Sequence, residues 1–199
     1  MSAKKDYELS AWSLNQKICG IDEAGRGPLA GPCVVCGVVL RPHVETGFID
    51  DSKKLSLKQR NEAYDLIQSI SEQIIIEVIS PKDIDEFNIY QATRMANEKI
   101  AQQAHVDLTL TDAMPLNDTI NHVSLIKGDQ LSVSIACASI VAKVTRDRIM
   151  EEYDEMYPQY GFKKHKGYPT VLHYEAIEKY GVLPIHRRSF KLFKQPTLF

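Results

Sequence analysis

"KICGIDEAGRGPLAGPCVVCGVVL", residues 17–40, contains two apolar runs rich in β-branched side chains, with a turn-prone segment between them. Such runs on either side of glycine and proline predict a hairpin or two adjacent strands. Asp22 and Glu23 lie at the end of the first run, directly before Gly25, Arg26 and Gly27. The segment therefore predicts two acidic side chains at a strand end, next to a loop whose main chain is little covered.

The patterns further along the chain predict a mixed α/β sheet covered by helices. Ser56, with Gln59 three residues later, has the spacing of a helix N-cap and capping box. Apolar periodicity then predicts strands over 72–80, 106–113 and 123–129, two helices over 81–104, and further helices over 132–156 and 169–181. Strands interleaved with helices are typical of this fold class.

The composition indicates a chain that buries a core and carries no membrane segment. Its 199 residues are 44% hydrophobic, which suffices for one main domain. No run approaches the roughly 18 apolar residues of a membrane span, and the charged N-terminal segment lacks the apolar centre of a signal peptide. We therefore expect a soluble, cytoplasmic protein with no membrane partner. The four cysteines lie in apolar runs, which favours buried thiols over a zinc site.

The charge is uneven along the chain. The formal net charge is −2, yet residues 163–199 hold eight Lys and Arg against two Glu, a balance of +6 that leaves −8 on the rest. A basic end beside an acidic body is typical of an enzyme that binds a polyanion at a carboxylate centre. A basic tail that is only solvated surface is the alternative.

Two more acids follow predicted strands, so that acidic side chains stand at the ends of three segments. These acids are Asp112 and Asp129. Carboxylate oxygens are the ligands that Mg²⁺ and Mn²⁺ prefer. Four carboxylates around two such ions would activate a water molecule and stabilise the leaving oxygen in phosphodiester cleavage. Each acid taken singly is also typical of a turn or a helix cap, so both interpretations stay open at this point.

Five segments, in this order, identify a family. They are GIDEAGRGPLAGP, DSKKLS, KGD…SIACASIVAKVTRD, PQYGF…HKGYPT and HRRSF. Together they resemble the type 2 ribonucleases H, the ribonuclease HII family, over roughly residues 17–190. The resemblance implies a ribonuclease H-like mixed sheet flanked by helices. It also implies a catalytic domain over 17–156 and a small helical, substrate-binding extension over 157–194.

The activity implied by the resemblance is metal-dependent hydrolysis of the RNA strand in RNA–DNA hybrids. It includes incision on the 5′ side of a single ribonucleotide in duplex DNA, which leaves 3′-hydroxyl and 5′-phosphate ends. The cofactor would be Mg²⁺ or Mn²⁺, with two ions in the reactive complex, and the family's metal-binding acids fall on Asp22, Glu23, Asp112 and Asp129. The third acid of the family usually precedes glycine, whereas Asp112 precedes alanine, so Asp107 and Asp118 stay as alternatives.

The implied nucleic-acid contacts begin at the glycine loop. A lone ribose differs from its deoxyribose neighbours by the 2′-hydroxyl, which both donates and accepts hydrogen bonds. Main-chain groups of Gly25, Arg26 and Gly27 can approach that hydroxyl because glycine has no side chain. Arg26 would also contact a phosphate or hold the loop in place.

Further contacts are implied in the motifs that follow the glycine loop. Tyr168 would stack against the sugar next to the ribonucleotide and test its shape. Lys53 and Lys54 would contact phosphates. His165 and His173 are expected to be surface residues.

The chain ends in KLFKQPTLF, which is similar to the QxxLF peptide by which bacterial replication proteins dock in the sliding clamp. The docking residues of the tail 195–199 would be Gln195, Leu198 and Phe199, and a tail folded back on the domain is the alternative.

We expect a monomer, since no long coiled coil or apolar stripe is evident. Two other functions stay open. One is a catalytically silent RNA–DNA binding module; the other is ribonuclease HIII, for whose extra N-terminal domain the roughly 16 residues before the first strand leave no room.

Overall fold

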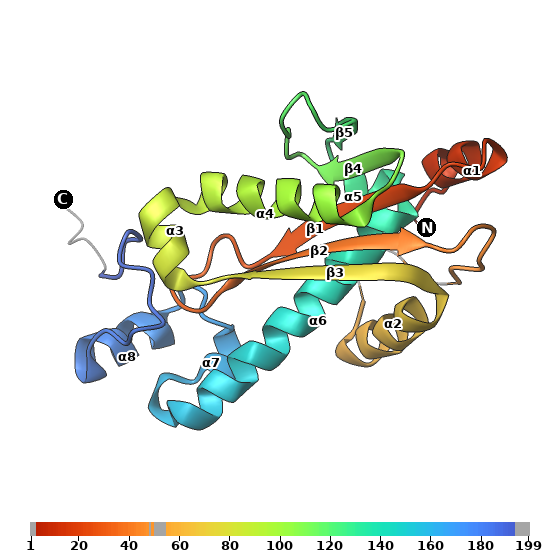
Figure 1. Ribbon diagram of the computed structural model, residues 1–199. Coiled ribbons are helices and arrows are strands. Elements are labelled where there is room, and N and C mark those ends of the chain that lie inside the picture. The colour runs from red at the N-terminus through yellow and green to blue at the C-terminus, as the bar shows by residue number, and fades with distance from the viewer. Residues whose placement is uncertain (1–2, 48, 50–54, 194–199) are drawn as a thin grey trace, which may run out of the picture.

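A five-stranded sheet in the order β3-β2-β1-β4-β5 forms the centre of the molecule (Figure 1). The computed structural model describes residues 3–47, 49 and 55–193. The strands are β1 Ile18–Ala24, β2 Cys33–Leu40, β3 Ser71–Ile79, β4 Leu108–Asp112 and β5 His122–Leu125. β2 pairs antiparallel with β1 and β3, whereas β4 pairs parallel with β1 and β5. The predicted mixed sheet and the pairing of the two runs within residues 17–40 are thus confirmed.

Helices cover both faces of this sheet. They are α1 Asp6–Ser13, α2 Leu57–Ile70, α3 Pro81–Phe87, α4 Ile89–Ala104, α5 Gly128–Leu131, α6 Val133–Met156, α7 Phe162–His165 and α8 Val171–Tyr180, with a 3₁₀ turn η1 at Pro158–Tyr160. The long helix α6 crosses β1 and β2 on one face, where α2 packs beside it, and α4 lies on the other face (Figure 1). The capping box predicted at Ser56 and Gln59 is present at the start of α2. None of the described helices is long and apolar enough to cross a membrane.

β2 is buried on both faces, and alternate side chains enter two different cores. Val34 and Cys36 pack with α2 and α6, whereas Cys33 and Val35 pack on the side of α4. Residues three apart on a strand point to opposite faces, so the C-x-x-C spacing separates the two thiols. All four cysteines are buried and free, as the apolar runs predicted. The spacing is therefore part of the core pattern.

Two glycines let a helix approach the sheet closely on each face. A Cβ atom on Gly20 of β1 would lie 2.3 Å from the carbonyl carbon of Ser134 in α6. A Cβ atom on Gly37 of β2 would lie 2.3 Å from Cγ2 of Ile100 in α4. Real Cβ atoms do not come so close to other heavy atoms, so neither strand position accepts a side chain without displacement of the helix. This packing sets the height of α6 above the end of β1.

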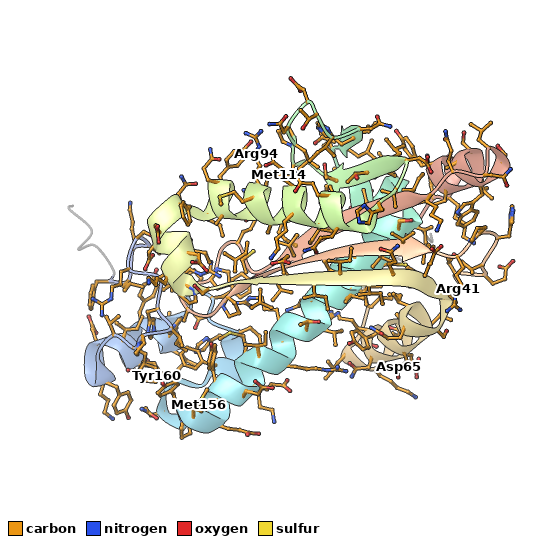
Figure 2. All side chains as sticks on the ribbon, in the orientation of Figure 1. Arg41, Asp65, Arg94, Met114, Met156 and Tyr160 are labelled. Carbon is orange, nitrogen blue, oxygen red and sulfur yellow. The ribbon has the colours of Figure 1, made fainter. Side chains whose placement is uncertain are left out.

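The C-terminal elements pack against the far end of α6 and against the loop that follows β1. Tyr160, Phe162 and Ile177 form a buried cluster with Leu29 of that loop and Met150 of α6. Tyr160 lies beside the end of α6, among side chains of α7 and α8 (Figure 2). The chain after α8 then returns to the same loop, where an isolated antiparallel bridge joins residues 30 and 186. The extension and the loop after β1 therefore share one core.

The prediction that His165 and His173 are surface residues is wrong, because both are buried within this cluster. Their rings stack with centroids 4.6 Å apart, and the ring of Phe162 meets both edge-on. His186 joins them through a hydrogen bond to His173. Burial lowers the pKa of His173 and the pKa of His186 to about 4, so both rings are neutral at pH 7. The surrounding aromatic rings come from distant segments, which local polarity does not reveal.

Acidification is expected to destabilise the protein between pH 6.5 and pH 4. In this window the unfolded chain binds protons at His173 and His186, while the folded chain does not. The free energy of unfolding then falls as the pH falls, by up to about 1.4 kcal/mol per pH unit for each histidine. The titratable neighbours of the pair are His165 and Tyr160. Thermal unfolding followed by circular dichroism across this range measures the slope.

A variant that removes one of the two imidazoles, His173→Gln, is expected to show a shallower dependence on pH. The exposed His43 provides the matched control, since His43→Gln removes an imidazole without removing a buried one. An unchanged slope in His173→Gln would contradict the assignment of the pH dependence to this cluster.

Candidate active site

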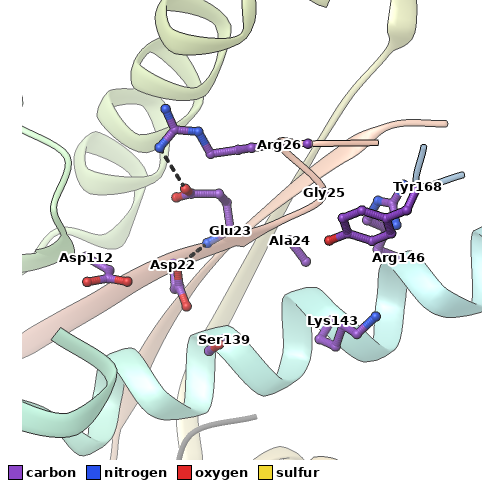
Figure 3. A pocket seen from close by; sticks show the side chains of 11 residues that line it. Asp22, Glu23, Ala24, Gly25, Arg26, Asp112, Ser139, Lys143, Arg146 and Tyr168 are labelled. Carbon is purple, nitrogen blue, oxygen red and sulfur yellow. Dashed lines mark hydrogen bonds and ion pairs between the residues drawn. The ribbon is translucent and has the colours of Figure 1, made fainter. Parts of the chain in front are cut away.

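A cavity of about 290 Å³ opens at the end of β1, and both predicted acids of that strand line it (Figure 3). The glycine loop, residues 25–27, forms a second part of its wall. The remaining wall is formed by Asp112 at the end of β4, by Ser139, Lys143 and Arg146 of α6, and by Tyr168. Segments that lie far apart in the sequence therefore meet in one cavity.

Parallel pairing places Asp112 beside Asp22. Ile21 of β1 lies opposite Thr111 of β4, so the next residue on each strand is an aspartate at the same end of the sheet. The main-chain N–H of Glu23 donates to Oδ1 of Asp22 at 2.7 Å. The N–H of residue 128 donates to Oδ1 of Asp112 at 2.8 Å. Each aspartate is thus held by a main-chain donor, and the side chains face the cavity (Figure 3).

The electrostatic state of Asp22 shows how closely the acids are gathered. Burial and then the charge of Glu23 raise the pKa of Asp22 well above its usual range, and the charge of Asp112 adds to this effect. A hydrogen bond with Ser139 acts in the opposite direction. Like charges held this close repel one another, and a bound cation would relieve the repulsion.

The donor atoms fit a hard divalent cation, since they are all carboxylate oxygens. Within residues 3–47, 49 and 55–193, no group of three or more Asp, Glu, His or Cys side chains is placed to hold an ion by itself. Mg²⁺ does not need such a cage, because it usually binds through one or two carboxylates together with waters and substrate phosphate oxygens. The acids therefore fit a cation whose coordination is completed by the substrate.

The other candidate acids do not line this cavity. Asp129 is buried on the short helix α5 and does not line the cavity, although its neighbour Gly128 binds Asp112. Asp107 precedes β4 at the opposite end of that strand, where it binds the N–H of the residue before β1. Asp118 is exposed in a turn. Of the three acids considered for the third position, Asp112 is the one at the cavity.

The two glycines of the glycine loop have different environments. Gly25 has a φ of +100°, and a Cβ atom there would lie 2.1 Å from Nε of Arg146 and 2.9 Å from the carbonyl oxygen of Pro32. Gly27 has no positive φ, and the nearest atom to its Cβ position is Cε1 of Tyr168 at 3.8 Å. Gly25 is therefore required by backbone conformation and packing, whereas Gly27 leaves its main chain open to the cavity.

Arg26 extends from the glycine loop and forms an ion pair with Glu23, with Nη1 3.3 Å from Oε1 (Figure 3). Its side chain is 41% exposed, so the pair is partly solvated and weak by itself. Two roles were considered for Arg26, a contact with a phosphate and holding the loop in place. The contact with Glu23 agrees with the second role. Lys143 projects from α6 into the same cavity and pairs with Asp147 at 2.7 Å.

Two fully buried arginines bind main-chain carbonyl groups of the glycine loop and of the residues just after it. Arg146 of α6 donates to the carbonyl oxygens of residues 30, 32 and 166. Arg187, after α8, donates to the carbonyl oxygens of Gly25, Arg26 and Gly31 at 2.6, 2.9 and 3.0 Å. Burial and the charge of Arg146 lower the pKa of Arg187 to about 10, so it stays charged at pH 7. Carbonyl dipoles, not carboxylates, accept all six hydrogen bonds, and positive charge therefore remains beneath the cavity.

Tyr168 closes the wall of the cavity opposite the acids. Its ring lies over the guanidinium of Arg146, with 5.9 Å between the guanidinium carbon and the ring centroid, and the residue is 42% exposed. Its position next to Gly27 brings the predicted sugar-stacking residue and the glycine loop together. The other predicted contacts, Lys53 and Lys54, and the predicted clamp-docking residues Gln195, Leu198 and Phe199 lie outside the described residues.

The sequence matches one known family over most of its length. The sequence model described as Ribonuclease HII matches residues 19–193. The chain belongs to the ribonuclease HII family. A ribonuclease HII from Sulfurihydrogenibium sp. (strain YO3AOP1) is 49% identical over 179 residues, which cover 89% of this chain and 91% of that relative. This chain is accordingly a ribonuclease H endonuclease that hydrolyses RNA.

Solved structures of ribonuclease HII have the same fold. The enzyme from Archaeoglobus fulgidus, solved as a complex with PCNA, aligns with a TM-score of 0.77 and 25% identity over 91% of this chain and 98% of its own. The ribonuclease H2 from Pyrococcus horikoshii OT3 aligns with a TM-score of 0.71 and 26% identity over 88% of this chain and 94% of its own. The ribonuclease H-like mixed sheet flanked by helices, as predicted, is confirmed.

Sequence reasoning missed four residues that shape the site of this ribonuclease HII. Arg187 binds the glycine loop, Arg146 binds carbonyl groups just after it, Ser139 binds Asp22, and Lys143 faces the cavity. Arg187 lies within the HRRSF segment and the other three lie within the segment that ends in KVTRD. The motifs thus contained the signal, but the residue type alone does not tell a buried arginine from a solvated one.

Substitution of the two loop glycines is expected to separate folding from activity. Gly25→Ala should destabilise the protein by more than about 2 kcal/mol, because the new methyl group meets Arg146 and a carbonyl oxygen at a strained φ. Gly27→Ala should change stability by less than about 1 kcal/mol, yet lower hybrid cleavage about ten-fold or more, since the methyl group enters the cavity wall. Thermal unfolding and cleavage of an RNA–DNA hybrid measure the two effects. Wild-type cleavage by Gly27→Ala would contradict a substrate-facing main chain at this position.

Proposed function

We propose that this ribonuclease HII hydrolyses the RNA strand of RNA–DNA hybrids and also incises on the 5′ side of a single ribonucleotide embedded in duplex DNA. The products are 3′-hydroxyl and 5′-phosphate ends. The observation that carries the proposal is the meeting of acids, an uncovered main chain and an aromatic ring in one cavity. Phosphate chemistry and sugar recognition then act on neighbouring groups of the same nucleotide.

Asp22, Glu23 and Asp112 would hold the divalent cations, Mg²⁺ or Mn²⁺, with Asp129 as the fourth acid. The chemistry that two such ions supply when bound is activation of a water molecule and neutralisation of charge on the leaving oxygen. The chain itself orients the acids, since main-chain N–H groups donate to Asp22 and Asp112. The hydrogen bond with Ser139 favours the ionised form of Asp22, which is the form that binds a cation.

The glycine loop would recognise the 2′-hydroxyl of the ribonucleotide. Arg187 engages the carbonyl oxygens of Gly25 and Arg26 from below, which fixes the direction of these peptide groups. Within the described part of the chain, the N–H groups of Arg26 and Gly27 have no protein acceptor and so remain available as donors. Because the 2′-hydroxyl both donates and accepts, a fixed main chain with no Cβ atom at residue 27 suits it.

Tyr168 would pack against the deoxyribose that follows the ribonucleotide. Its half-exposed ring stands at the cavity wall beside Gly27, so a sugar held there touches both elements. A flat aromatic face discriminates by shape, and an additional hydroxyl on the following sugar would disturb the packing. This arrangement would favour the junction between RNA and DNA.

Positive charge would hold the nucleic-acid backbone near the cavity. Arg146 and Arg187 are buried and donate their hydrogen bonds to main-chain carbonyl groups, and Lys143 enters the cavity from α6. The extension over 157–194 is rich in lysine and arginine, which suits the proposed substrate-binding part of the chain. We propose phosphate contacts for Lys53 and Lys54 as well.

Cleavage of a duplex that contains one ribonucleotide tests the function directly. With Mg²⁺ or Mn²⁺, the purified chain should cut on the 5′ side of the ribonucleotide, and a chelator should abolish the reaction. Asp112→Asn should lower kcat by about 1,000-fold or more with little loss of stability, because it removes a ligand charge but keeps the shape of the side chain. Gel mapping of the ends identifies the incision site and the terminal groups.

Asp118→Asn provides the matched control, since Asp118 is exposed and away from the cavity. It should cleave as the unaltered chain does. Binding of the duplex without cleavage would instead support a catalytically silent binding module, and full activity of Asp112→Asn would move the third ligand elsewhere.

We also propose that the protein is a cytoplasmic monomer. Its C-terminal tail would dock on a replication sliding clamp. The tail carries Gln195, Leu198 and Phe199 in the QxxLF pattern. The structurally similar ribonuclease HII from Archaeoglobus fulgidus was solved in complex with PCNA, a sliding clamp. A Leu-Phe pair at the end of a polar sequence suits an apolar pocket of a partner.

Removal of residues 195–199 is expected to weaken clamp binding at least about ten-fold while cleavage of a short duplex is unchanged, because the anchor residues of a peptide interface supply most of its affinity. Surface plasmon resonance with an immobilised bacterial clamp measures the binding. A double change, Leu198→Ala with Phe199→Ala, should reproduce the loss in a chain of full length. Equal binding by the truncated chain would overturn this proposal.

A further inference from the structure

Two buried histidines, His173 and His186, connect the segment after α8 to the wall of the cavity, and a third, His165, packs beside them. His165 precedes the loop that carries Tyr168, His173 lies on α8, and His186 lies directly before Arg187. All three are 9% exposed or less. Nε2 of His173 lies 3.1 Å from Nε2 of His186, and Nδ1 of His173 lies 3.0 Å from the carbonyl oxygen of Tyr168.

The direction of each hydrogen bond in this chain follows from its two main-chain ends. The N–H of Leu183 donates to Nδ1 of His186 at 2.9 Å, so this nitrogen carries no proton. A neutral His186 then has its proton on Nε2 and donates to Nε2 of His173. His173 in turn has its proton on Nδ1, which donates to the carbonyl oxygen of Tyr168. One consistent set of tautomers thus runs from Leu183 to Tyr168.

His165 is fixed separately and lies outside this chain of hydrogen bonds. Its Nδ1 accepts from the N–H of Gly167, and its Nε2 lies 2.8 Å from the carbonyl oxygen of Tyr160. It stacks on His173 and covers that ring from one side. His165 therefore packs the cluster, while the other two histidines carry the connection to Tyr168.

The two ends of the connection lie next to the glycine loop and Tyr168, which line the cavity. Arg187, the neighbour of His186, holds the carbonyl oxygens of Gly25 and Arg26. His173 holds the carbonyl oxygen of Tyr168, whose ring faces Gly27. The short segment 186–187 thus contacts the glycine loop directly and Tyr168 through one imidazole ring.

We propose that His173, whose tautomer His186 fixes, is a positioning residue that sets Tyr168 against the glycine loop and thereby favours a single ribonucleotide over a continuous hybrid. The inference rests on the proposed function, in which the loop binds the ribose and Tyr168 tests the next sugar. A single ribonucleotide offers one 2′-hydroxyl and one deoxyribose at a fixed separation, so its cleavage depends on the spacing of these two elements. A continuous hybrid offers a ribose at every step, so its cleavage depends less on this spacing.

Two substitutions of His173 separate positioning from packing. The amide of glutamine reaches the place of Nε2 and keeps an acceptor for His186, but loses the donor to Tyr168. The amide of asparagine reaches the place of Nδ1 and keeps that donor. His173→Gln should lower the ratio of kcat/KM for a one-ribonucleotide duplex to kcat/KM for a continuous hybrid about five- to ten-fold, the effect of one lost hydrogen bond. His173→Asn should stay within about two-fold of the unaltered chain.

A double-mutant cycle with Tyr168→Ala tests whether His173 acts through Tyr168. In the Tyr168→Ala background, His173→Gln should change the ratio less than about two-fold, because the group that it positions is gone. His122→Gln is the matched control, since both ring nitrogens of His122 also bind main-chain groups, but between β4 and β5 on the other side of the molecule. It should leave the ratio unchanged.

The outcomes distinguish this inference from the proposed function. If the unaltered chain cleaves neither substrate, the proposed function fails. If the unaltered chain cleaves both, the positioning role is overturned by either of two results. One is an equal change of the ratio in His173→Gln and His173→Asn. The other is an undiminished effect of His173→Gln on the ratio in the Tyr168→Ala background; in both cases the cluster contributes packing alone. Thermal unfolding of each variant at pH 7 shows whether the fold is kept, and a ratio measured on the folded fraction is unaffected by the amount that unfolds.

Discussion

Like charge crowded at the ends of β1 and β4 is the constraint around which the site is arranged. Asp22 is buried and lies beside Glu23 and Asp112, and burial together with the charges of these two neighbours raises the pKa of Asp22 well above its usual range. Main-chain N–H groups of residues 23 and 128 and the hydroxyl of Ser139 offset part of the repulsion among these carboxylates. Hydrogen bonds to charged acceptors contribute about 1.5–3 kcal/mol each, which does not remove the repulsion. The mutually repelling carboxylates are therefore suited to bind a cation together with a phosphate group of the substrate.

The glycine loop next to these acids depends on side chains from distant parts of the chain. Its carbonyl oxygens point to Arg187, and the carbonyl oxygens just after it point to Arg146. A buried arginine without such acceptors would be very costly, and a loop without such donors would be free to change shape. Each stabilises the other, and the loop is presented to the cavity in one conformation.

The C-terminal extension belongs to the site as much as the sheet does. Tyr168 and Arg187 come from it, and its core is shared with the loop after β1 through Leu29 and Met150. The neutral histidines His173 and His186 inside that core bind main-chain groups of Tyr168 and Leu183. A boundary near residue 157 therefore divides the sequence but does not divide the cavity.

Most of the strands, the capped helix and the family could be predicted from the sequence, because these depend on local order: apolar alternation over residues 17–40, the pair Ser56 and Gln59, and motifs in a fixed succession. The strand predicted over 123–129 is shorter, since β5 ends at Leu125 and Asp129 lies on helix α5. Which residues come together in space could not be predicted from these local patterns. Asp112 stands beside Asp22 through strand register across ninety positions of sequence, while Asp129 lies outside the cavity. The burial of His173 also came from contacts between distant segments. Long-range packing selects such partners by shape and hydrogen-bond geometry, and no local pattern of residue types contains that information.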